Sequence, residues 1–410
     1  MATQGELQTA STRVGLFGLL GCGNIGNDAS MEAVIRYIRA RHPGVTIDAM
    51  CLGAETVRQE YGIEAISLRW SVNYERAVFK AVAPAFKVLS RFVDLVRTAA
   101  WVRRHEVVIV PGMGVLETSL PTRPWHMPYS MFLVLLWGRI FGIRTALVSV
   151  GAGRVEGRLN RLLLDAVARL AFYRSYRDVR SREVMRQRGL DVTHDRVYPD
   201  LAFNLPIMSS DPGDLGIVCV GIMDYRGSNA DRARADEVYA VYIDAMKHFV
   251  RWLVSEGRKV RLIIGDTNNC DEWALQELLE DVRIYLPDID AEQVVAAPVA
   301  SFADVMRAIA PAGTVVATRF HNVVCALRLS KPTIALGYGP KFGALMADMG
   351  VPEFCQDART LSAHELIGLF CELEQRQAEV RHRLRARNDI YEQLLDDQFK
   401  ALSAVLFGMN

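Results

Sequence analysis

Short runs of β-branched and apolar residues alternate with helix-length segments along almost the whole chain, and this alternation restricts the possible folds most. In the first half, strands are predicted at 14–20, 45–52, 107–110 and 145–150. Strands that alternate with helices pair in parallel, because a helix supplies the crossover that a parallel connection needs. The pattern therefore predicts an α/β domain in which helices cover both faces of a parallel sheet.

A second series of the same kind follows a short segment of linker composition. Residues 204–215 concentrate Pro, Ser, Gly and Asp, which mark loops. Further strands are predicted at 216–221, 260–265, 294–297, 314–318 and 333–336, with helical patterns between them. We expect two Rossmann-like α/β domains, 1–207 and 208–362, facing each other across a cleft. The helical tail, 363–410, is long enough to cross back over the first domain.

The composition excludes several classes of protein. Hydrophobic residues make up 50% of the chain, charged residues 23%, and the net charge is +1, so we expect an ordinary globular protein without a nucleic-acid partner. The seven cysteines show no C-x-x-C spacing, which predicts reduced thiols in a cytoplasmic protein. The N-terminus lacks the order of a secretory signal. The most apolar window, 131–150, contains two arginines, so no membrane span is expected.

The sequence GCGNIG at 21–26 matches the dinucleotide-binding pattern G-x-G-x-x-G, with Asp48 on the next predicted strand. Asp48 lies inside that strand rather than at its end, which does not favour contact with a ribose. A structural tight turn is one alternative. Another is a helix N-terminus whose backbone N–H groups contact an anion or a sugar hydroxyl. Asn27 and Asp28 are also suited to capping the helix that follows.

Three further loops follow predicted strands or begin helices. Two of them contain glycines, which let a ligand approach the backbone at the carboxyl end of a strand. These glycines are Gly112, Gly114, Gly151 and Gly153. The third loop contains Arg177 and Asp178, where Asp178 can cap a helix. Arg177 either points into the cleft or is a solvated charge at the helix start.

The most informative segment is Thr318-Arg319-Phe320-His321, at the end of an apolar strand. Alternate residues of a strand share a face, so we expect Arg319 and His321 to point the same way and Phe320 to pack on the other side. Lys341 follows the next strand-end loop. Three cationic or cationisable groups near a helix N-terminus predict a site for a small polyanion.

In order and spacing, these motifs resemble the polysaccharide pyruvyl transferase family, which moves a pyruvyl group from phosphoenolpyruvate to sugar hydroxyls. The matching segments are 24–28, 112–114, 149–153, Arg177-Asp178 with Ser181, 200–203, Arg319 with His321, and 338–341 with Asp348 and Gly350. The resemblance implies a GT-B-like fold and a cyclic pyruvate ketal as the product. It implies phosphoenolpyruvate as donor, a glycan or lipid-linked glycan as acceptor, and neither a metal nor a resident cofactor.

The resemblance also implies roles for individual residues. His321 would act as general acid beside Arg319, and Arg319 and Lys341 would hold the phosphate and carboxylate of the donor. The implied donor-binding residues are Lys341, Arg177, Tyr338 and Asn322. The implied acceptor or loop contacts are Asn24, Asp28, Gly112, Gly114, Gly151 and Gly153.

The sequence departs from the family pattern at three points. Gly26-Asn27-Asp28 shifts an acidic residue by one position, Met113 interrupts the usual three glycines, and Asn322 stands where glycine is frequent. These departures bear more on the acceptor than on the reaction. Two alternatives stay open: a nucleotide-sugar glycosyltransferase of the GT-B class, and a non-catalytic glycan-binding relative.

The segment 75–104 has an apolar stripe at helical spacing, and Pro84 should break or kink it. Its basic residues are Arg76, Lys80, Lys87, Arg91, Arg97, Arg103 and Arg104. Such a helix can lie on an anionic bilayer at the inner face of the membrane. The alternative is an intradomain helix with a solvated basic face.

Overall fold

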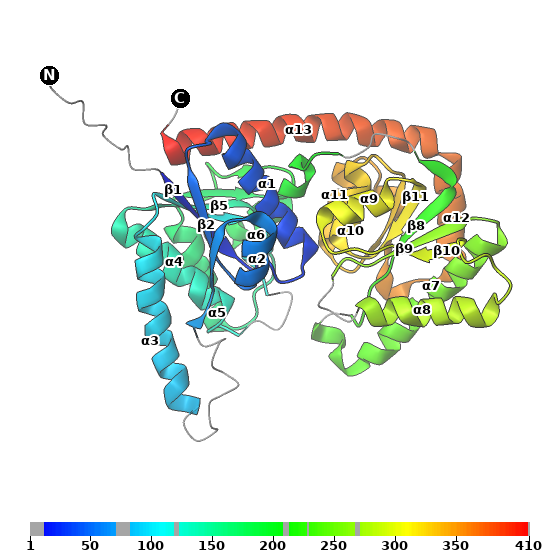
Figure 1. Ribbon diagram of the computed structural model, residues 1–410, viewed down its shortest axis with the longest axis horizontal. Helices are drawn as coiled ribbons and strands as arrows, with labels where there is room; N and C mark the ends of the chain where they lie inside the picture. Colours follow the sequence, from blue (N-terminus) through cyan, green and yellow to red (C-terminus); the bar gives the residue numbers. More distant parts are fainter. Residues whose placement is uncertain are drawn as a thin grey trace.

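Two parallel β-sheets, each packed between helices, form two domains that lie side by side in a computed structural model of the chain (Figure 1). The structure describes residues 12–70, 83–118, 123–207, 213–227, 229–266 and 271–408. The prediction of two α/β domains with parallel sheets is confirmed. The first sheet ends with β7 (Arg196–Val197) and the second begins with β8 (Asp214–Gly221), on either side of the segment with linker composition.

The first sheet has seven strands in the order β3-β2-β1-β4-β5-β6-β7. Its other strands are β1 (Arg13–Gly18), β2 (Thr46–Cys51), β3 (Glu64–Ser67), β4 (Val107–Pro111), β5 (Arg144–Val150) and β6 (Tyr173–Tyr176). Its helices are α1 (Ile25–Arg41), α2 (Ala54–Tyr61), α3 (Ala83–Val102), α4 (Met127–Phe141), α5 (Arg158–Leu170) and α6 (Val179–Gln187). Every residue of β4 is buried, as expected for a strand covered on both faces.

The second sheet has six strands in the order β10-β9-β8-β11-β12-β13. Its other strands are β9 (Lys259–Ile263), β10 (Val294–Ala296), β11 (Ala312–Ala317), β12 (Thr333–Gly337) and β13 (Cys355–Asp357). Its helices are α7 (Ala235–Ser255), α8 (Asp271–Tyr285), α9 (Phe302–Ile309), α10 (Phe320–Arg328), α11 (Pro340–Asp348) and α12 (Ala363–Gln375). Short 3-10 helices are η2 (Leu201–Asn204), η3 (Asn229–Arg234), η4 (Pro352–Phe354) and η5 (Ala358–Thr360).

The last helix, α13 (Gln377–Phe407), runs along both domains (Figure 1). On the second domain, the Asn388 amide donates to the Leu327 carbonyl at 2.8 Å. On the first domain, Phe399 stacks on Tyr37 with ring centroids 4.2 Å apart. The first half of the helix therefore contacts the second domain, and its second half contacts the first domain.

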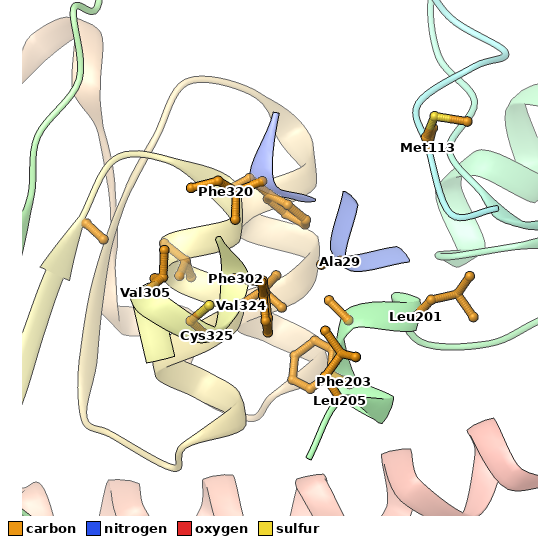
Figure 2. Packing of buried hydrophobic residues seen from close by; sticks show 14 of the residues in the cluster. Ala29, Met113, Leu201, Phe203, Leu205, Phe302, Val305, Phe320, Val324 and Cys325 are labelled. Carbon is orange, nitrogen blue, oxygen red and sulfur yellow. The ribbon is translucent and has the colours of Figure 1, made fainter. Parts of the chain in front are cut away.

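Apolar side chains of η2 fill the space between the domains (Figure 2). Phe203 packs edge-on against Tyr391 of α13 at 4.8 Å between ring centroids. Leu201 and Leu205 are also buried, and η2 contacts both α1 and α10. This apolar seam packs α10 against the first domain, and Arg328 in the last turn of α10 donates to the Leu205 carbonyl at 3.4 Å.

Helix α3 begins at Ala83, so Pro84 occupies its first turn, where the missing N–H is not needed. The part of the predicted 75–104 helix that lies before residue 83, including Arg76 and Lys80, falls outside the described residues. Within the described residues, no helix combines the length and apolarity that crossing a membrane requires.

Candidate active site

The loops at the carboxyl ends of both sheets touch each other beside the first turn of α10. Asn24 forms a bridge with Asp266, which follows β9. Gly26 lies so close to the His321 imidazole that a Cβ on Gly26 would be 1.8 Å from its Cε1 atom. Glycine at position 26 is therefore explained by the approach of this histidine from the other domain.

The rest of the G-x-G-x-x-G loop is held by its own side chains. Gly21 N–H donates to the Asp28 carboxylate at 2.6 Å, and Asn24 caps α1 by accepting from Asn27 N–H. Burial raises the pKa of Asp28 to about 6. Asp48 accepts from Trp101 Nε1 at 2.7 Å. These contacts favour the structural-turn interpretation, because the acidic residue of a dinucleotide site is already engaged in the core.

The structure corrects the predicted geometry of Arg319 and His321. The strand ends at Ala317 and α10 begins at Phe320, so the two residues do not share a strand face. Arg319 is the N-cap residue of α10, and His321 lies in its first turn. The strand ends one residue earlier than predicted and the helix begins two residues earlier, because the segment 320–328 has helical rather than alternating periodicity.

Arg319 is already paired with carboxylates of its own domain. Its Nε and one terminal nitrogen donate to both oxygens of Asp271, at 2.8 and 2.7 Å. Asp271 is fully buried, and Asp266 lies 3.9 Å from the third guanidinium nitrogen. This bidentate geometry satisfies the guanidinium charge. This geometry therefore does not favour the predicted role of Arg319 as a ligand of the donor phosphate, because Asp271 already occupies its guanidinium.

His321 has the opposite environment. Its Nε2 atom is buried without a hydrogen-bond partner in the described part of the chain. The nearest carboxylate oxygen belongs to Asp200, at 3.9 Å. Burial, together with the charges of Lys341 and Arg177, lowers the pKa of His321 to about 3. The imidazole is therefore neutral at physiological pH when no anion is bound.

Arg177 of the first domain reaches the same place. Its guanidinium lies over the Phe320 ring, 5.5 Å from the centroid, and only 9% of the side chain is exposed. One terminal nitrogen is 3.8 Å from Asp200, and Nε has no hydrogen-bond partner among the described residues. Asp178 caps α6 by accepting from Ser181 N–H at 2.6 Å. Of the two interpretations of Arg177, the structure excludes the solvated charge.

Lys341 lies beside the Phe320 ring, as Arg177 and His321 do. Its Nζ atom lies 4.9 Å from the Phe320 centroid and 5.4 Å from that of Tyr338. No carboxylate of the described residues is within ion-pair distance of it. Phe320, which was predicted to pack on the far side of the strand, instead contacts two cations from different domains. Cation–π attraction holds both cations near the ring.

The glycine loops of the first domain lie on one side of this group. The loop after β4 and the loop after β5 are joined by a bridge between Leu116 and Ala152. Gly151 leaves room for the Arg177 guanidinium, which would be 2.6 Å from an added Cβ. Gly114 and Gly153 both face the Glu117 carboxylate, at 2.6 and 2.4 Å from the corresponding Cβ positions.

The remaining predicted residues have different surroundings. Gly112 packs against Ser30 of α1: a Cβ added to Gly112 would lie 2.3 Å from the Ser30 hydroxyl oxygen. Its role is therefore in packing. Tyr338 stacks near Tyr225, with ring centroids 5.5 Å apart. Asn322 is fully buried, and neither atom of its amide has a hydrogen-bond partner in the described residues.

Two acidic residues beside this group, Asp200 and Glu117, were not among the predicted site residues. The Asp200 Oδ2 atom is buried without a hydrogen-bond partner within the described chain, and it lies between Arg177 and His321. Burial raises the pKa of Asp200, against the opposing effect of Arg177. Asp200 lies in the segment 200–203, which resembles the family, but no local sequence pattern predicted a role for it. Glu117 is an isolated acid in a loop and carries no sequence signal.

Several solved structures share this fold. A UDP-GlcNAc 2-epimerase from Neisseria meningitidis, bound to UDP-GlcNAc, matches with a TM-score of 0.62 and 10% identity over 97% of this chain and 100% of the other. MurG from Acinetobacter baumannii matches with a TM-score of 0.52 and 12% identity, covering 94% and 99%. TcCGT1 in complex with UDP matches with a TM-score of 0.58 and 9% identity, covering 97% and 100%. At these identities the likeness establishes the GT-B fold alone.

The sequence itself identifies the family. No curated protein matches the chain. The model of the polysaccharide pyruvyl transferase family matches residues 24–340, which include the loops of both domains that meet at His321. The chain therefore belongs to the polysaccharide pyruvyl transferase family.

Proposed function

We propose that this protein transfers a pyruvyl group from phosphoenolpyruvate to two hydroxyls of one sugar, forming a cyclic ketal. The observation that carries the proposal is the half-buried group of Arg177, Lys341 and His321, which has no carboxylate closer than 3.8 Å in the described chain. Charges that are largely removed from water without close partners are costly. A ligand with two anionic groups would remove that cost.

Phosphoenolpyruvate has the required shape and charge, because its phosphate and carboxylate are held on neighbouring atoms. The planar guanidinium of Arg177 suits a bidentate contact with one of these groups. Lys341 supplies a compact charge for the other. Arg319 is engaged by Asp271, so we assign it a positioning role: it fixes the turn that presents Phe320 and His321.

His321 changes protonation when the donor binds. In the empty site its pKa is about 3, because of burial and the two neighbouring cations. A bound anion neutralises those cations and favours the imidazolium, since opposite charge raises the pKa of a base. The donor thus creates the general acid that the reaction requires, at the place where the reaction occurs.

The chemistry then takes two steps. In the first, a sugar hydroxyl adds to C2 of the donor, His321 gives a proton to C3, which becomes a methyl group, and the hydroxyl proton passes to a base. In the second, another hydroxyl of the same sugar bonds to C2, and phosphate leaves with the electron pair of the C2–O bond. The proton of the second hydroxyl goes to phosphate. The proton that the base took from the first hydroxyl passes to His321, which replaces the proton given to C3.

Glu117 is the residue that we propose as the first base. Its carboxylate faces Gly114 and Gly153 on the acceptor side of Arg177. In the described residues, Glu117 forms no ion pair with a basic side chain. It is therefore available to accept a proton from a hydroxyl placed over the glycine loops.

The test is to incubate the protein with phosphoenolpyruvate and candidate glycans. We expect phosphate release together with a glycan mass gain equal to one pyruvate ketal. Release without the mass gain would indicate hydrolysis and contradict the transfer.

Donor choice separates the proposal from the nucleotide-sugar alternative. Phosphoenolpyruvate should raise the melting temperature in a saturable way, because a ligand that binds only the native state stabilises it. UDP-GlcNAc, the ligand of one protein of similar fold, is the comparison ligand. Stabilisation by UDP-GlcNAc alone would favour a glycosyltransferase. If neither ligand raises the melting temperature, the result would favour the non-catalytic glycan-binding alternative.

A further inference from the structure

Helix α3 carries an apolar stripe that nothing in the described chain covers. Val88, Leu89, Phe92 and Val96 are 55–67% exposed, although they recur at helical spacing on one side of the helix. A shallow groove lined by Phe92, Val93, Val96, Arg97 and Ala100 runs along the same face. Contiguous exposed apolar side chains of this size mark an interaction surface.

Apolar side chains are also exposed on helix α4 and just before it. The two helices pack together: Trp137 Nε1 of α4 donates to the Leu95 carbonyl of α3 at 3.1 Å. Trp125, just before α4, and Ile140, near its end, are 51% and 57% exposed. In Figure 1, α3 lies along the outer side of the first domain, away from the second domain and from α13. We call Val88, Leu89, Phe92, Val96, Trp125 and Ile140 the apolar face.

Acidic residues are scarce on the two helices that carry this face. Asp94 is the only acidic residue in α3 and α4, and it is buried against Arg91 and Arg97 at 3.4 and 3.8 Å. Exposed arginines on these helices or next to them in the chain are Arg103, Arg104, Arg123 and Arg139, and the neighbouring exposed acid is Glu106. Two of the basic residues predicted for this segment, Arg91 and Arg97, are thus paired with Asp94 on α3. Among the described residues, the exposed positive charge comes from the arginines outside α3.

We propose that the apolar face docks on an anionic lipid bilayer. Apolar and aromatic side chains enter the boundary between headgroups and acyl chains, and arginines at the edge attract anionic headgroups. A symmetric contact between two copies of the chain would place the same exposed arginines opposite each other, which like charges disfavour. The bilayer supplies both the apolar phase and the opposite charge.

The docking site lies on the domain that carries Glu117 and the glycine loops, and Trp125 follows Glu117 closely in the chain. A membrane surface on this side would bring a lipid-linked glycan to the loops that face Arg177. This consequence rests on the proposed function, whereas the docking itself does not depend on the chemistry of the site.

Co-sedimentation with vesicles tests the docking directly. The full chain should pellet with vesicles of phosphatidylcholine mixed with phosphatidylglycerol, and much less with phosphatidylcholine alone. The double variant F92E/V96E should weaken binding at least about tenfold, because it places carboxylates in the acyl boundary. Removing Arg103 and Arg104 should weaken binding by about fivefold per arginine, from roughly 1 kcal/mol each.

The matched control is I284E, which changes an equally exposed apolar residue on α8 of the other domain (71% exposed). It should bind vesicles as the wild type does, and all variants should keep the wild-type melting temperature. Absence of wild-type pelleting with the anionic vesicles would overturn the proposal. So would an equal loss in I284E, or sedimentation velocity showing a wild-type dimer that F92E/V96E dissociates.

Discussion

Two arginines near the ends of the sheets show how differently the same side chain can be used. Arg319 is bound by both oxygens of buried Asp271. Arg177 lies over the Phe320 ring with carboxylates no nearer than 3.8 Å and an unpartnered Nε atom among the described residues. The first charge is satisfied by the protein and stabilises its turn. The second lacks a close carboxylate among the described residues, and we propose that it binds the donor together with Lys341. Substitutions at the Arg319–Asp271 pair should therefore lower stability, whereas substitutions in the group around Arg177 should lower donor binding or turnover.

His321→Ala should have the largest effect on turnover. Loss of a general acid reduces the rate by about 10²–10⁴-fold. Because His321 Nε2 makes no hydrogen bond in the described structure, the melting temperature should change little. Turnover and melting measured on the same preparation check both points, and normal pyruvyl transfer by the folded variant would remove His321 from the mechanism.

Asp271→Asn should instead act on stability. It leaves the Arg319 guanidinium in a buried site without its carboxylate, and breaking a buried pair costs about 3–5 kcal/mol. Urea unfolding measures this loss. The control is Glu183→Gln, which breaks the exposed pair with Arg186 and should cost less than about 1 kcal/mol. Equal stability changes in the two variants would contradict the contrast drawn between the arginines.

Arg177→Ala should weaken the binding of phosphoenolpyruvate by roughly 10–100-fold, because hydrogen bonds to charged groups contribute about 1.5–3 kcal/mol. Arg177→Lys keeps the charge but loses the planar pair of donors, so its affinity should fall between those of the wild type and Arg177→Ala. Calorimetric titration gives both values. Unchanged affinity in Arg177→Ala would place the donor elsewhere.

Asp28→Asn should give the smallest effect, and it depends on pH. Burial raises the folded-state pKa of Asp28 to about 6 from an ordinary value of 3.8. The folded state thus favours the protonated carboxyl, and this contribution to stability is lost as pH rises through 6. An amide keeps the acceptor for Gly21 N–H without the charge. Relative to the wild type, the variant should gain on the order of 1 kcal/mol between pH 4 and pH 7, measured by urea unfolding. A difference independent of pH would contradict the raised pKa.

The sequence predicted most of the fold because its central strands and helices are long and strongly apolar. Strands β3, β6, β7 and β13 were missed, since each has four residues or fewer and contains polar residues. For such short segments, pairing with a neighbouring strand decides the structure rather than local periodicity.

The site was predictable only in part. His321, Lys341 and Arg177 follow strand ends, so the rule that ligands bind at the carboxyl ends of parallel strands locates them. The bidentate pair of Arg319 was not foreseeable, because its partner Asp271 lies 48 residues away with no local pattern. The closeness of Gly26 to His321 depends on how the two domains pack, which periodicity does not encode.

Calorimetric titration of phosphoenolpyruvate near neutral pH, in buffers of different ionisation enthalpy, tests the central claim most directly. The cations of Arg177 and Lys341 should bind the donor, and the bound anion should raise the pKa of His321 from about 3. We predict binding accompanied by proton uptake in the wild type, and binding without that uptake in His321→Gln. Absence of binding, or the same proton uptake in His321→Gln, would contradict the account.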